Sequence, residues 1–164
     1  MIVKEIRDED FTSYKKPSMV VGFPSCTFKC ERECGQKMCQ NSALAIAPNI
    51  EIDVNTLVRR YINNPITHAI ICAGLEPFDS PLALPEFVSE LRKYTEDDII
   101  IYTGYRKDEL THSFHSLTEA YNKVKQFKNI IIKFGRFVPN QQPHYDEVLG
   151  VKLASDNQYA ERIS

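Results

Sequence analysis

The fold of this chain is decided by a short apolar run, HAIICAG (68–74), that ends in glycine. DIIIYTG (98–104) and NIIIKFG (129–135) are of the same kind, and SMVVGF (18–23) is a similar apolar run that is followed by Pro24. Continuous apolar runs of this length, rich in β-branched residues, are typical of strands that are buried on both faces of a parallel sheet. The sequence therefore predicts four buried strands.

Segments with helical periodicity separate these runs. Apolar residues recur at spacings of three and four in VNTLVRRYI (54–62), LPEFVSELRKY (84–94) and SLTEAYNKVKQF (116–127). Strands that alternate with helices favour a parallel α/β sheet joined by right-handed crossovers. A complete eight-unit barrel usually takes about 250 residues. The 164 residues of this chain therefore predict one domain, 1–164, built as an open parallel sheet or a partial (βα) barrel.

Composition places the chain among ordinary globular proteins, with 43% hydrophobic and 26% charged residues. The net charge is −2, and no block of like charge suggests a nucleic-acid or anionic-membrane partner. No apolar run approaches the ~18 residues of a membrane span, and the first residues lack the pattern of a signal peptide. A cytoplasmic location is therefore expected. The polar segments 1–17 and 139–164 are expected to be mostly irregular.

Four of the five cysteines fall within one loop, residues 24–41, directly after the run at 18–23. They are Cys26, Cys30, Cys34 and Cys39. Such clustering, in an odd total, favours metal or redox chemistry over a disulfide framework. Zinc modules usually separate two cysteine pairs by a dozen or more residues, whereas a short loop can wrap a multi-iron cluster. The residues favour an iron–sulfur cluster, with structural zinc and a metal-free loop as alternatives. Cys72, inside an apolar run, is interpreted as a core residue.

The cysteine loop resembles the motif of the radical S-adenosylmethionine (radical SAM) enzymes, C-x3-C-x2-C with an apolar residue before the last cysteine. Cys26-Thr-Phe-Lys-Cys30 matches the first half. Position 33 holds no cysteine, and Met38-Cys39-Gln40-Asn41 matches the surroundings of the third cysteine after an insertion that carries Cys34. The resemblance implies that Cys26, Cys30 and Cys39 bind a [4Fe–4S] cluster. It also implies that Met38, Cys39 and Gln40 lie at the cofactor.

Three ligands leave one iron of such a cluster open, whereas four close it and allow only electron transfer. In the family, the open iron binds SAM, and reductive cleavage of SAM releases a 5′-deoxyadenosyl radical that abstracts hydrogen from a substrate. A non-catalytic carrier, in which Cys34 supplies a fourth ligand, is the alternative within iron–sulfur proteins.

The end of the run at 68–74 resembles a second element of the family. Gly74-Leu75-Glu76-Pro77 is similar to its G-G-E-P sequence, with leucine in place of the second glycine. Ligands bind at the carboxyl edge of parallel sheets, and a carboxylate there can pair with the ammonium group of SAM. The resemblance therefore implies that these four residues contact the cofactor.

The end of the run at 98–104 narrows the resemblance to a subfamily. Ile101-Tyr102-Thr103-Gly104-Tyr105, followed by Lys107-Asp108-Glu109-Leu110, resembles the Y-T-G-Y…E-E-L segment of the activating proteins of anaerobic, class III ribonucleotide reductases. Tyr102, Thr103 and Gly104 are thereby implied in cofactor binding, since glycine allows a bound nucleoside to approach the backbone closely.

The resemblance extends from about Met19 to Arg162. It implies an oxidoreductase, a radical SAM activase that uses SAM and a reductant such as reduced flavodoxin to generate a glycyl radical on an anaerobic ribonucleotide reductase. The alternatives are a radical SAM enzyme that acts on another glycyl-radical enzyme or on a small molecule, an iron–sulfur carrier, and a structural-zinc interaction module. Neither a Walker A loop nor G-x-G-x-x-G occurs, which argues against nucleotide hydrolysis and nicotinamide chemistry.

Overall fold

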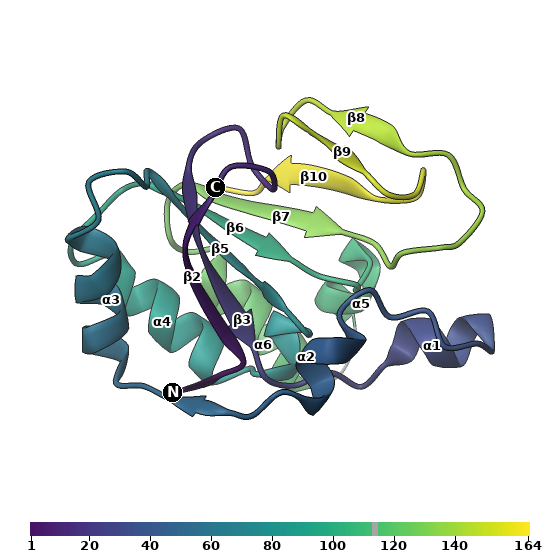
Figure 1. The fold of residues 1–164 in the computed structure, drawn as a ribbon, viewed down its shortest axis with the longest axis horizontal. Helices are drawn as coiled ribbons and strands as arrows, with labels where there is room; N and C mark the ends of the chain where they lie inside the picture. Colours follow the sequence, from purple (N-terminus) through teal and green to yellow (C-terminus); the bar gives the residue numbers. More distant parts are fainter. Residues whose placement is uncertain (113–114) are drawn as a thin grey trace.

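A mixed six-stranded sheet forms the centre of the molecule in a computed structural model that describes residues 1–112 and 115–164 (Figure 1). Its strand order is β10-β7-β6-β5-β3-β2. The four inner strands are parallel to one another: β3 (Ser18–Phe23), β5 (Ala69–Gly74), β6 (Asp98–Tyr102) and β7 (Ile130–Phe134). They coincide with the four apolar runs, so the predicted buried strands and the α/β class are confirmed. The sheet is open, since among the described residues no pairing joins its two edge strands.

Three helices cover one face of this sheet (Figure 1). They are α3 (Val54–Ile62), α4 (Ala83–Leu91) and α6 (His115–Val124). Each corresponds to a predicted helix, and α3 begins at Asp53, whose carboxylate accepts the Thr56 N–H at 2.9 Å as an N-cap. The predicted helix 84–94 ends early at Leu91, because the chain tightens there into a turn in which the Tyr94 N–H donates to the Leu91 carbonyl.

The opposite face of the sheet is covered by two segments from the ends of the chain. Side chains alternate along each strand, so Ile70 and Ile99 pack toward the helices while Ile71 and Ile100 point the other way. The second set packs against Tyr14, from the loop 11–16, and against Leu149 and Leu153, from a hairpin of β8 (His144–Asp146) and β9 (Val151–Leu153). Both faces are therefore buried, as the continuous apolar runs predicted.

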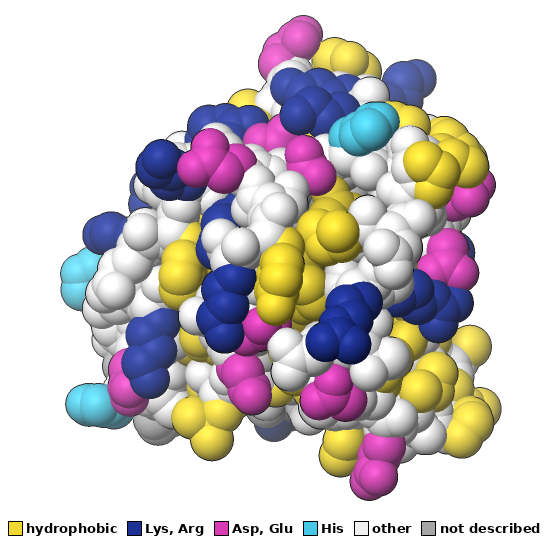
Figure 2. All heavy atoms as spheres, turned by 90° about the vertical axis from the view of Figure 1, so that its left-hand side faces the viewer, with side chains coloured by type: hydrophobic (Ala, Val, Ile, Leu, Met, Phe, Trp, Pro, Cys, Tyr) yellow, Lys and Arg dark blue, Asp and Glu magenta, His cyan; other side chains and the backbone are white. Residues whose placement is uncertain are grey.

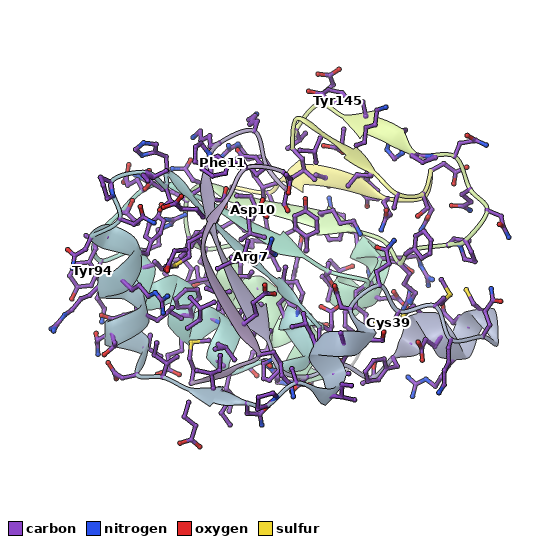
Figure 3. The ribbon with its side chains drawn as sticks, viewed as in Figure 1. Arg7, Asp10, Phe11, Cys39, Tyr94 and Tyr145 are labelled. Carbon is purple, nitrogen blue, oxygen red and sulfur yellow. The ribbon has the colours of Figure 1, made fainter. Side chains whose placement is uncertain are left out.

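Residues 1–17 and 139–164, which were expected to be mostly irregular, also contain short strands that the sequence did not predict. They contain β1 (Ile2–Val3), β2 (Glu5–Asp10), β8, β9 and β10 (Tyr159–Arg162). β2 and β10 pair antiparallel at the two edges of the sheet, which corrects the expected all-parallel sheet to a mixed one. Edge strands tolerate charged side chains, and in β2 Arg7 pairs with Glu5 and Asp10 at 2.9 and 2.8 Å (Figure 3). Because the sequence of β2 is polar, its pattern did not predict a strand.

The remaining elements are short and gather near the carboxyl ends of the parallel strands. They are α1 (Lys29–Cys34), α2 (Ser42–Ile46), β4 (Ile50–Glu51), the 3-10 helix η1 (Pro77–Asp79) and α5 (Lys107–His112). Helix α1 follows β3, η1 follows β5, and α5 follows β6 (Figure 1). β4 pairs with β1 away from the main sheet. Three connections thus leave the sheet at the carboxyl ends of its parallel strands, where parallel sheets bind ligands.

One face of the molecule carries interspersed charges. On the face shown in Figure 2, Lys and Arg side chains lie among Asp and Glu side chains rather than forming a region of one sign. Within the described residues, no helix is both long and apolar enough to cross a membrane.

Candidate functional site

A cavity of about 350 Å³ opens at the carboxyl ends of the parallel strands. It lies on the sheet face that the loop 11–16 and the β8–β9 hairpin cover. All but one of the cofactor and metal residues implied by the sequence line it: Cys26, Cys30, Met38, Cys39, Gln40, Gly74, Leu75, Glu76, Tyr102, Thr103 and Gly104. The exception, Pro77, is buried as the first residue of η1. Three segments that are far apart in the sequence thus meet at one cavity.

The five cysteines divide into two groups. Cys26 precedes α1, Cys30 lies in α1, and all three cysteines of the motif are partly buried and line the cavity. Cys39 lies between α1 and α2 (Figure 3). Cys34, at the end of α1, is exposed and lies outside the cavity lining. Cys72 is fully buried in β5, which confirms its interpretation as a core residue. The geometry therefore separates Cys34 from the three cysteines of the motif.

The surroundings of Cys26 and Cys30 disfavour the thiolate forms of their side chains. Burial raises the pKa of the Cys26 thiol to about 12, and the nearby carboxylates of Glu76 and Asp79 add to the effect. Burial also raises the pKa of Cys30. Without a cation these side chains stay protonated, whereas a bound metal supplies the positive charge that stabilises their thiolate forms.

Three cysteine side chains line this one cavity: Cys26, Cys30 and Cys39. Among the described residues, no three His, Cys, Asp or Glu side chains lie close enough together to hold one metal ion. In a cube of four irons, each thiolate binds a separate iron.

Two side chains hold the segment around Cys39. The Glu31 carboxylate accepts the N–H groups of Met38 and Cys39 at 3.2 and 3.1 Å. The Asn41 amide donates to the Gly74 carbonyl at 2.6 Å, which ties the cysteine loop to the end of β5. Neither Glu31 nor Asn41 was predicted as a site residue, although Asn41 belongs to the segment Met38-Cys39-Gln40-Asn41 that resembles the motif.

Glu76 joins the ends of β5 and β6. It is buried, and its carboxylate accepts hydrogen bonds from the Thr103 hydroxyl at 2.8 Å, the Gly104 N–H at 2.8 Å and the Phe78 N–H at 3.1 Å. Burial raises its pKa to about 7 in spite of these donors. A carboxylate offers about four acceptor positions, so most of its capacity is used within the protein. Glu76 therefore shapes the cavity as well as facing it.

Gly74 allows the ends of β5 and β3 to approach each other closely. Its φ is +87°, and a Cβ at this position would stand 2.6 Å from the Gly22 Cα on β3. Only glycine fits both the left-handed backbone and this spacing.

Lys133 is a cavity residue to which the sequence analysis assigned no role. Its side chain is buried, its ammonium group donates to the Gly135 carbonyl at 2.7 Å, and it lies 6.0 Å from the centre of the Tyr102 ring. Burial lowers its pKa to about 8, although the charge of Glu76 opposes the shift. Among residues 1–112 and 115–164, Lys133 forms no ion pair with a carboxylate. The signal in the sequence was a lysine inside the apolar run NIIIKFG.

The roof of the cavity also went unpredicted. Thr12 and Ser13 line one side of it, and the Tyr102 hydroxyl fixes their loop by donating to the Ser13 carbonyl at 2.6 Å. Residues 151–154 line another side, and Gln158 holds them by accepting the Ala154 N–H at 3.1 Å. These segments were expected to be irregular, so no pattern in the sequence placed them over the site.

Comparison of the chain with protein-family models, with curated proteins and with solved structures finds no match. The site is therefore interpreted from its own geometry and chemistry.

Proposed function

We propose that this chain is a radical SAM enzyme, with a [4Fe–4S] cluster on Cys26, Cys30 and Cys39 and with SAM in the adjoining cavity. One observation carries the proposal. The cysteine loop and the ends of β5 and β6 resemble three separate elements of the family, and they line a single cavity at the edge of the sheet. A coincidental likeness in three distant segments would not require them to meet.

The residues around the cavity suit the carboxylate and the amino group of the methionine part of SAM. The cluster, when bound, supplies the electron that cleaves the sulfonium carbon–sulfur bond of SAM. Lys133 presents a buried ammonium group that can pair with the carboxylate of SAM, and Glu76 retains acceptor capacity for its amino group. The roof from loop 11–16 and residues 151–154 covers part of the cavity and limits the access of water to it.

We extend the proposal to the architecture and treat the sheet as a partial (βα) barrel. The strands β3, β5, β6 and β7 are neighbours in the order of the chain, are parallel, and carry their helices on one face. This arrangement is what a fragment of a (βα) barrel would have. The antiparallel strands β2 and β10 end it at both sides.

We propose further that the substrate is a glycyl-radical enzyme, namely an anaerobic ribonucleotide reductase, and that reduced flavodoxin or a similar protein supplies the electron. Support comes from the resemblance of Tyr102–Tyr105 and Glu109–Leu110 to the activating proteins of these reductases. The modest cavity volume agrees, because a protein substrate needs no enclosed site of its own.

Anaerobic reconstitution of cysteine variants tests the proposal. We expect the wild-type protein to bind about four irons, and its electron paramagnetic resonance spectrum to change when SAM is added. Alanine at Cys26, Cys30 or Cys39 should abolish stable cluster binding, because each removes one ligand. Cys34→Ala, in the same loop but outside the cavity, is the matched control and should retain the cluster and cleavage of SAM.

Two outcomes contradict this assignment. If Cys34→Ala loses the cluster while Cys39→Ala keeps it, the third ligand is wrong. If the protein binds zinc in preference to iron, or if its spectrum does not respond to SAM, the radical SAM proposal fails and the structural-zinc or carrier alternatives replace it.

A further inference from the structure

A network of buried charges connects helix α1 to α5 and to the end of β7. At its centre is Glu109 of α5, whose side chain is 7% exposed. Its carboxylate pairs with Arg136 at 2.8 Å and with Lys29 of α1, and it accepts the Arg106 N–H at 2.8 Å. These contacts outweigh the effect of burial and lower the pKa of Glu109 to about 2, so the group is an anion.

Helix α1 is held by this network at two residues. Lys29 pairs with Glu109, and Glu33 receives the Arg136 guanidinium at 3.3 Å. Residues four apart lie on the same face of a helix, so one face of α1 is directed toward Arg136 and Glu109. The Tyr105 ring lies between, 5.9 Å from the Lys29 ammonium and 5.9 Å from the Arg136 guanidinium.

A second chain of hydrogen bonds holds the residues just before α1. The Tyr105 hydroxyl donates to Asp79 at 2.6 Å, and the other oxygen of Asp79 accepts the Thr27 N–H at 2.7 Å. Thr27 directly follows Cys26, so this contact fixes the chain between the two cysteines Cys26 and Cys30.

Apart from this network, the side-chain hydrogen bonds of helix α1 among the described residues are those that Glu31 accepts from the Met38 and Cys39 N–H groups. The helix has six residues, none of which is buried, and no side chain caps its first turn. Short helices are only marginally stable alone and normally depend on a packed apolar face. For α1, charged contacts replace that apolar face.

We infer that Lys29, Glu109 and Arg136 form a charge clamp that positions helix α1, and with it Cys26 and Cys30, against the sheet. They are positioning residues, since Cys30 and Cys26 face the cavity while the clamp holds the helix that carries them. That the clamp supports cluster binding rests on the proposed function. The clamp itself is a property of the metal-free chain.

The test uses Lys29→Gln, because Lys29 is 38% exposed and its loss leaves the Arg136–Glu109 pair intact. Glu109→Gln would instead leave the buried Arg136 with only the exposed Glu33 as an ion-pair partner and endanger the fold. Arg32→Gln is the matched control. It removes the same charge from the same helix, and Arg32 is exposed and has no ion pair among the described residues. Lys29→Arg keeps the charge and should behave as the wild type.

Amide hydrogen exchange of residues 29–34 in the metal-free protein is the first measurement. We expect Lys29→Gln to accelerate exchange at residues 29–34 about threefold to tenfold. This range corresponds to a stabilisation between that of a surface ion pair and that of a charge-assisted hydrogen bond. Exchange in β5 and β6, and the melting temperature, should stay near those of the wild type. Unchanged exchange at 29–34, or equal acceleration in Arg32→Gln, would overturn the clamp.

Iron loss to a chelator from the reconstituted protein is the second measurement. Lys29→Gln should lose iron faster than the wild type, and Arg32→Gln and Lys29→Arg should not. Equal rates in Lys29→Gln and the wild type would remove the clamp's role toward the cluster. If the wild type binds no cluster, the proposed function fails, while the exchange experiment still decides on the clamp.

Discussion

Lys133 shows most clearly how a single residue acquires a role from its neighbours. In a strand of isoleucines, its stem continues the apolar surface while its ammonium group reaches the cavity, where a backbone carbonyl is its hydrogen-bond acceptor. A buried charge without a counter-charge is costly, and burial accordingly lowers its pKa to about 8. Under the proposed function, the carboxylate of SAM is the anionic group that we propose to pair with Lys133.

Replacing Lys133 by methionine, which has a similar length and no charge, should weaken SAM binding about tenfold to a hundredfold. This is the range expected for a lost charge-assisted hydrogen bond. Lys152→Met is the control, because Lys152 also lines the cavity but is exposed to solvent, and its loss should change the affinity about twofold at most. Equilibrium dialysis with the reconstituted variants measures both effects. Equal losses in the two variants would contradict the assignment.

At the level of elements, Asp98 joins three segments at the start of β6. Its carboxylate accepts hydrogen bonds from Tyr14 at 2.9 Å, Lys16 at 2.6 Å and Arg162 at 2.7 Å. Tyr14 and Lys16 belong to the loop 11–16, and Arg162 ends β10. Asp98 thus attaches the loop 11–16 of the roof at the end of the strands that lies opposite the cavity.

Asp98 should stabilise the fold only while it is ionised. Burial would raise its pKa, but the hydrogen bonds from Lys16, Arg162 and Tyr14 outweigh burial and lower the pKa to about 2. The pKa in the unfolded chain is about 3.9, so the contribution is complete above about pH 4 and is lost as the pH falls toward about 2. Because Lys16 and Arg162 are nearly half exposed, solvent screening reduces the effect.

Asp98→Asn should therefore lower the free energy of unfolding by about 1–2 kcal/mol near neutral pH. The difference from the wild type should shrink below about pH 4, as both proteins become uncharged at this position. Urea unfolding at several pH values measures it. Asp108→Asn, at an exposed ion pair with Arg106, is the control and should change stability by at most ~0.5 kcal/mol. If the difference in the free energy of unfolding between Asp98→Asn and the wild type does not depend on pH, the charge of Asp98 is not its cause.

On the scale of the whole molecule, the size of the cavity limits what the protein can enclose. Ligand pockets usually hold about 300–1,000 Å³, and this one, at about 350 Å³, is at the low end. One cofactor of drug-like size fills such a volume. A second small substrate would find no enclosed site beside it, so we expect the substrate to bring its own surface to the mouth of the cavity.

The isolated protein should therefore cleave SAM slowly under dithionite and without productive turnover. Addition of an anaerobic ribonucleotide reductase should increase formation of 5′-deoxyadenosine and produce an organic radical signal, because the partner completes the cavity and excludes water. Chromatography and electron paramagnetic resonance measure the two products, with a variant reductase lacking the glycine as the control. Repeated conversion of a small metabolite without any protein partner would contradict the activase proposal.

Local patterns in the sequence determined the inner layers of this fold. The runs at 18–23, 68–74, 98–104 and 129–135 became the four parallel strands, because a strand buried on both faces must be apolar at every position. Helix α3 was predicted over its full length, since its amphipathic period and its Asp53 cap are local features. The likeness to radical SAM motifs singled out the residues that now line the cavity, and what they bind stays a prediction.

Tertiary structure alone decided the edges and the supports of the site. β2 and β10 are polar strands that exist through pairing with β3 and β7, and a pattern of burial cannot reveal strands that bury little. Lys29 meets Glu109 across eighty positions of the chain, and Arg136 reaches both α5 and α1. Hydrophobic periodicity records which face of an element is buried, but it contains no information on which distant charge a side chain will meet. That choice follows from the packing of the complete chain.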